Sequence, residues 1–100
     1  MTHHQTGRTL QQQRTSLPAA DALAAAVRFF SRGSGIYSAF LDKQGPTYVN
    51  LRGQGGEEIV IAAHEENGGT SVTGSSYMFD AQVAQFLSSL PAAAATEAVS

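Results

Sequence analysis

The stretch "TYVNLRGQGGEEIVIAA" (residues 47–63) has strand character at both ends and a glycine cluster in its middle. "TYVNLR" and "EIVIAA" are rich in β-branched and aromatic residues, which favour β-strands. The cluster from Gly53 to Gly56 begins like a dinucleotide-binding fingerprint, but Glu58 stands where the fingerprint needs its third glycine. A strand pattern then follows where the fingerprint needs a helix. We therefore interpret the glycines as a hairpin turn that uses positive φ.

Strand character extends to both sides of this hairpin. "IYSAFL" (36–41) precedes it and "TSVT" (70–73) follows it, and turn-forming clusters separate all of these segments. The segment centres recur about every eleven residues, within the ~8–12 residues that separate consecutive hairpin strands. The pattern predicts a four-stranded antiparallel meander.

A helix is expected on each side of the meander. "LPAADALAAAVRFFSRG" (17–33) has one apolar helical stripe, which consists of Ala20, Leu23, Ala24, Val27 and Phe30. "FDAQVAQFLSSLP" (79–91) repeats the helical spacing, with Asp80 expected at the N-cap. The predicted fold is α+β: an N-terminal helix, a four-stranded antiparallel β-meander and a C-terminal helix, arranged in two layers.

The chain is expected to form one domain with polar or alanine-rich ends. One hundred residues are too few for a second core, and we place the single α+β domain at residues 16–91. Residues 1–15 are polar, rich in Gln and Thr and without apolar periodicity, so we expect a flexible arm whose removal leaves the core intact. Residues 92–100 carry no apolar stripe, so we expect a disordered tail.

The composition also bears on location. The N-terminus lacks the apolar core of a secretory signal. No stretch approaches the ~20 apolar residues that a membrane span needs. We therefore expect a cytoplasmic protein that does not contact membranes.

The charged residues are distributed unevenly along the chain. Residues 1–52 contain six basic and two acidic residues, a charge of +4, whereas residues 53–100 contain six acidic residues and no Lys or Arg, a charge of −6. Because the net charge is only −2, we favour the interpretation that the halves complement each other, within one subunit or between two. A basic half can also contact nucleic acid. The candidate basic contacts are Arg8, Arg14, Arg28 and Arg32.

The sequence predicts no catalytic, cofactor or metal site, and therefore no enzyme. The absence of cysteine excludes disulfides, thiol catalysis and zinc sites with cysteine ligands. "HEENG" lacks the second histidine of a zinc-protease motif, and "TGSSYM" lacks the final glycine of a nucleophile elbow. A triad of Ser75 or Ser76 with His64 and Asp80 finds no support in the spacing of these residues. Turns and a short polar loop account for all of them.

The strand "EIVIAA" is apolar on both of its sides. Ile59 and Ile61 alternate with Val60 and Ala62, although a two-layer domain leaves one face of its sheet in water. A core of this size is also marginal by itself. We therefore expect a partner subunit to cover the second side. The candidate interface consists of Tyr48, Asn50, Arg52, Val60 and Ala62.

We expect a small non-enzymatic interaction module, a homodimer that presents a sheet face or groove to a protein partner. One alternative is a nucleic-acid-associated protein that uses the basic N-terminal arm and the first helix. The other is a small-molecule binder or enzyme, which needs a pocket with convergent polar groups between the helices and the sheet. No cofactor is expected.

Overall fold

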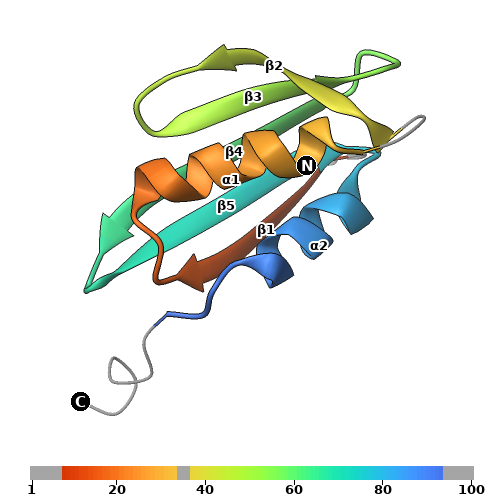
Figure 1. Ribbon diagram of the computed structural model, residues 1–100. Coiled ribbons are helices and arrows are strands. Elements are labelled where there is room, and N and C mark those ends of the chain that lie inside the picture. The colour runs from red at the N-terminus through yellow and green to blue at the C-terminus, as the bar shows by residue number, and fades with distance from the viewer. Residues whose placement is uncertain (1–7, 34–36, 94–100) are drawn as a thin grey trace, which may run out of the picture.

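The computed structural model describes residues 8–33 and 37–93. In chain order the elements are β1 (Arg8–Thr15), α1 (Ala19–Ser31), β2 (Ala39–Gln44), β3 (Tyr48–Gly53), β4 (Glu58–Glu66), β5 (Gly69–Tyr77) and α2 (Asp80–Ser89). The five strands form one antiparallel sheet in the order β1-β5-β4-β3-β2. Both helices cover the same side of this sheet, α1 mainly over β2, β3 and β4, and α2 over β5 and β1 (Figure 1). The predicted α+β class is confirmed, as is the order of helix, meander and helix from α1 onward.

The sheet has five strands, where we predicted four. The additional strand, β1, lies within the segment 1–15 that we expected to be a flexible arm, and it pairs with β5 along its whole length. It escaped prediction because its residues are almost all polar, so neither of its sides shows an apolar pattern. Backbone hydrogen bonds to β5 and the packing of α2 hold it in place. Residues 1–7 of the predicted arm and 94–100 of the predicted tail lie outside the described residues, and Ala92 forms an isolated bridge with Thr15.

Two hairpin turns use residues with positive φ. At the end of β3, the Gly53 N–H donates to the Glu57 carbonyl (2.7 Å) and the Gly56 N–H donates to the Gly53 carbonyl (3.0 Å). Gly56 has a φ of 90°, and the glycine cluster is confirmed as the turn between β3 and β4. Between β4 and β5, Asn67 and Gly68 have φ of 52° and 80°, the combination of a two-residue type I′ turn.

The buried side of α1 differs from the predicted stripe. Its buried residues are Ala22, Leu23, Ala26 and Phe30. Ala20 and Ala24, which we placed on the stripe, are exposed. Because alanines occur all around this helix, they do not distinguish one side from another, and the large side chains of Leu23 and Phe30 set its orientation. Alanine on the buried side lets the helix backbone lie close to the sheet.

The core lies between the helices and the inner side of the sheet. Ile61 of β4 is completely buried there, as is Phe30 of α1 at 1% exposure. The ring centroids of Phe30 and Phe86 lie 5.8 Å apart and join the two helices. Gly74 allows α2 to pack closely on β5, because a Cβ atom at this position would lie 2.6 Å from Val83 Cγ1. The inner side of the sheet is therefore covered within the chain itself.

Candidate protein-interaction surface

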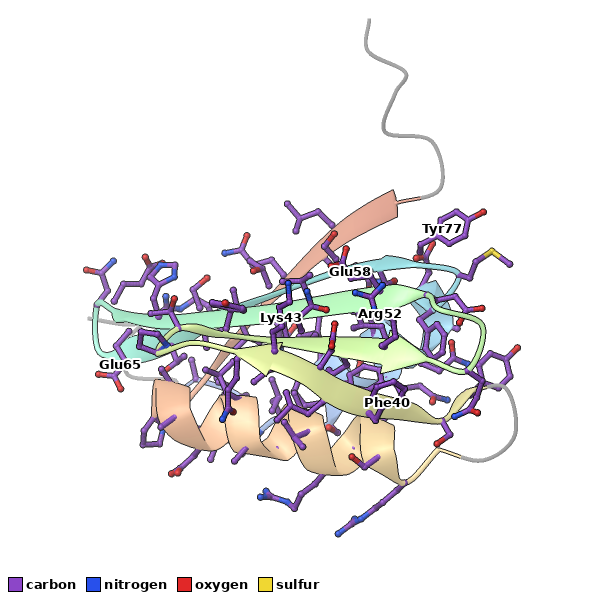
Figure 2. All side chains as sticks on the ribbon, turned by 90° about the horizontal axis from the view of Figure 1, so that it is seen from above. Phe40, Lys43, Arg52, Glu58, Glu65 and Tyr77 are labelled. Atoms are coloured by element: carbon purple, nitrogen blue, oxygen red, sulfur yellow. The ribbon has the colours of Figure 1, made fainter. Side chains whose placement is uncertain are left out.

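Within residues 8–33 and 37–93, one side of the sheet carries no helix, and we refer to it as the open face. Side chains alternate across a strand, so the residues of β4 divide between the two sides. Ile61 is buried beneath α1, whereas Val60 and Ala62 are half-buried on the open face. In Figure 2, Arg52 and Glu58 stand on the side of the sheet away from α1.

The residues predicted as an interface lie together on the open face. They belong to β3 and β4, which are adjacent, antiparallel and in regular register. The cross-strand pairs are Tyr48 with Ala62, Asn50 with Val60, and Arg52 with Glu58. The structure therefore brings the predicted residues into one continuous surface and adds Glu58 to it.

Three large apolar side chains that we did not predict extend this surface. Leu10 on β1, Phe40 on β2 and Tyr77 on β5 are 72%, 54% and 48% exposed. Phe40 lies opposite Arg52, and Leu10 lies opposite Ser75 of β5. Leu10 was hidden from the sequence by its polar neighbours, but the strand alternation of "IYSAFL" could have indicated Phe40. The three side chains lie on both sides of β3 and β4, with Leu10 and Phe40 on the two edge strands.

Charged and amide side chains occupy the centre of this surface. The Arg52 guanidinium donates from Nη2 to Asp42 Oδ2 (3.0 Å) and from Nη1 to the Gly56 carbonyl (3.1 Å). Beside it, Asn50 Nδ2 donates to Glu58 Oε2 (2.8 Å). The Arg52 and Asp42 side chains are 36% and 32% exposed, so this ion pair contributes at most about 1 kcal/mol to stability. Its main effect is to fix the orientation of the guanidinium on the open face.

The end of the open face near the β4–β5 turn is covered by the chain's own polar side chains. Arg14 Nη1 lies 3.3 Å from Glu66 Oε2, and His64 Nε2 lies 3.0 Å from Glu66 Oε1. Gln12 Nε2 donates to Ser71 Oγ (2.9 Å), and Ser71 is only 2% exposed. Arg14 and Glu66 also join the basic and acidic halves within one chain. These polar side chains leave the other end of the open face, around Val60, uncovered.

The predicted basic contacts do not form one surface. Arg14 lies on the edge strand β1 and pairs with Glu66. Arg28 and Arg32 are exposed at the C-terminal end of α1, in the other layer of the domain. Arg8 begins β1, and its side chain lies outside the described part of the structure. The helix and the arm therefore present their charges in different directions.

The residues considered for catalysis are not arranged as a triad. Ser76 Oγ donates to Asp80 Oδ1 (3.1 Å) at the start of α2. His64 lies opposite Ser71, about 16 Å along the sheet from Ser76 at ~3.3 Å per residue.

Within residues 8–33 and 37–93 there is no group of three His, Asp or Glu side chains that could hold a metal ion. Over the same ranges, neither helix combines the length and the hydropathy needed to cross a membrane.

A cleft of about 480 Å³ opens between the C-terminal end of α1 and α2. Its lining residues are Phe29, Phe30, Arg32, Gly33, Tyr37, Gln82 and Gln85. Arg32 and Gln85 are exposed to solvent, so the described side chains do not provide the convergent, buried polar groups that fix a small ligand. The open face is therefore the stronger candidate site.

Comparison with protein-family models, with curated proteins and with solved structures finds no match to this chain. The role of the open face must therefore be inferred from its own residues.

Proposed function

We propose that the chain is a non-enzymatic interaction module that forms a homodimer through the apolar part of the open face. The observation that carries this proposal is a five-stranded sheet with both helices on one side and exposed apolar side chains on the other. Burial of a large apolar side chain stabilises an interface by about 1.5–3 kcal/mol. Phe40, Tyr48 and Tyr77 offer several such contributions around Val60. The remaining surface of the dimer is available to a protein partner.

The balance of charge on the open face favours a protein over nucleic acid. Arg52 lies beside Asp42 and Glu58, Arg14 pairs with Glu66, and Lys43 lies opposite Asn50, so three basic side chains are balanced by three acidic ones. Nucleic-acid binding depends on an excess of Lys and Arg that neutralises phosphates. The open face has no such excess among its described side chains, whereas mixed charges around apolar residues suit a protein surface.

The test is the molar mass of the wild-type chain and of Val60→Lys, measured by sedimentation velocity at tens of micromolar. We expect a wild-type dimer, because a specific dimer with micromolar or tighter affinity is populated at this concentration. Val60→Lys should be a folded monomer, because the new charge would be buried at the centre of the interface. Ala84→Lys, on the exposed side of α2, is the matched control and should remain a dimer. A monomeric wild-type chain would overturn the proposal.

A further inference from the structure

One row of side chains across the open face is complementary in charge to the same row read from the other end. In the register of the strands, Phe40 lies opposite Arg52, and Arg52 lies opposite Glu58. Ser76 pairs with Ile59, which places Tyr77 next to Glu58. The row therefore reads aromatic, acidic, basic, aromatic on β5, β4, β3 and β2. Figure 2 shows Arg52 and Glu58 on the open face, with Tyr77 at the same end of the sheet.

We infer that the homodimer has a two-fold axis that runs parallel to the strands, midway between the two facing sheets and level with the gap between β3 and β4. This inference rests on the proposed function and adds the geometry of the partner, a second copy of this chain. Rotation about this axis exchanges β4 with the partner's β3 and β5 with the partner's β2. Glu58 of each copy then faces Arg52 of the other, and Tyr77 faces Phe40. Each contact occurs twice, as a two-fold interface requires.

The neighbouring rows fit the same axis. Val60 would face Asn50 of the second copy, and the small side chain of Ala62 would face the large ring of Tyr48. Facing sheets pack about 10 Å apart, so a large ring near the axis packs well against a small side chain opposite it. The Val60–Asn50 and Ala62–Tyr48 combinations supply that complementarity on both sides of the axis.

A two-fold axis across the strands fits the charges less well. If such an axis passed at the level of Val60 and Asn50, it would place the row of Arg52 over the row of Tyr48. Arg52 would then face Tyr48, and Glu58 would face Ala62. Both charges would lose water without gaining an opposite charge from the second copy, which is costly at an interface. If the axis passed through the row of Arg52 itself, like charges would face each other.

Exchanging the two charges tests this geometry. In a dimer of Arg52→Glu, two glutamates would face Glu58 of the other copy, and in a dimer of Glu58→Arg, two arginines would face Arg52. Because close interfacial charge pairs are strongly coupled, we expect each variant alone to dimerise at least about 100-fold more weakly. An equimolar mixture should recover a one-to-one heterodimer, because every facing pair is again of opposite charge. Native mass spectrometry separates this heterodimer from both homodimers by mass.

The second test uses the double variant Arg52→Glu/Glu58→Arg, in which one chain carries both substitutions. This variant should dimerise with nearly wild-type affinity. Circular dichroism melts establish that each variant is folded, and the milder pair Arg52→Gln and Glu58→Gln replaces any variant that is not. For that pair, the two substitutions should be strongly non-additive in the dimer dissociation constant. A dimeric wild type whose charge variants dimerise normally alone, or do not recover in the mixture, would overturn this axis while leaving the homodimer proposal intact. A monomeric wild type would overturn both.

Discussion

On β4, neighbouring residues belong to two different environments. Ile61 is completely buried beneath the helices, whereas Val60 and Ala62 are half-buried on the open face. The inner side of the sheet is mainly apolar, its buried Thr70 and Ser76 are hydrogen-bonded within the chain, and it is covered by the chain's own helices. The open face mixes apolar, amide and charged side chains and has no covering layer among the described residues. The comparison indicates that stability comes mainly from the inner side, and the proposed association concerns the open face alone.

The largest expected effect comes from removing β1, the strand that closes one edge of the sheet. Deletion of residues 1–15 would expose β5 and remove the Gln11 hydrogen bond to the Asp80 carbonyl at the start of α2. Each lost backbone hydrogen bond contributes about 0.5–1.5 kcal/mol, so we expect a loss of more than about 3 kcal/mol or a failure to fold. Thermal melts measure this loss. Deletion of residues 1–7 keeps β1 complete and serves as the control.

The two sides of β4 can be compared directly by alanine substitution. Ile61→Ala should lower the free energy of unfolding by about 2–5 kcal/mol, because it leaves a cavity among packed side chains. Val60→Ala on the same strand should cost less than about 1.5 kcal/mol, since the side chain is half-exposed and its surroundings can adjust. Urea denaturation at a protein concentration low enough to keep every variant monomeric measures both, because lost dimer contacts then do not contribute. Equal losses would contradict the division between an inner and an open side.

The difference between the two sides of the sheet also bears on which features of the fold could be predicted from the sequence. The strand pattern of residues 58–63 and the glycine turn before them depend on local propensity and alternation, and both are confirmed. β1 depends instead on pairing with a strand about sixty residues away in the chain, and its polar residues carry no local sign of that pairing. The orientation of α1 also depended on the fold, because its many alanines left the buried side undetermined.

The candidate surface was predicted in part for the same reason. Val60 and Ala62 were found because an apolar residue on the wrong side of a strand is visible in the sequence. Leu10 was missed with β1, and Tyr77 was missed because the predicted fourth strand ended at residue 73, whereas β5 extends to Tyr77. Asp80, expected at the N-cap, is instead the first helical residue after Phe79 and accepts a hydrogen bond from Ser76. These features depend on the pairing of strands that lie far apart in the sequence and on the residues at which strands and helices begin and end.

Dimerisation through the open face can be weakened without changing the fold. Tyr77→Ala removes an exposed ring at the rim of the proposed interface, so we expect the dimer dissociation constant to rise about 10–100-fold. The melting curve of the monomer should hardly change, because Tyr77 is 48% exposed and packs little within the chain. Tyr77→Phe keeps the ring and should dimerise normally. Sedimentation equilibrium distinguishes the variants, and unaltered dimerisation of Tyr77→Ala would remove Tyr77 from the interface.

The smallest expected effect concerns the polar end of the open face, where Arg14 and Glu66 satisfy each other within one chain. Their side chains are 33% and 43% exposed, so water screens the ion pair, and a double-mutant cycle of Arg14→Gln and Glu66→Gln should give a coupling of about 0.2–1 kcal/mol. In 1 M salt the Debye length falls to about 3 Å, and the coupling should nearly vanish. Neither variant should change the molar mass of the protein, because this end lies outside the proposed interface. A coupling above about 2 kcal/mol, or a variant that becomes monomeric, would show that the polar end takes part in association and that the interface extends over the whole open face.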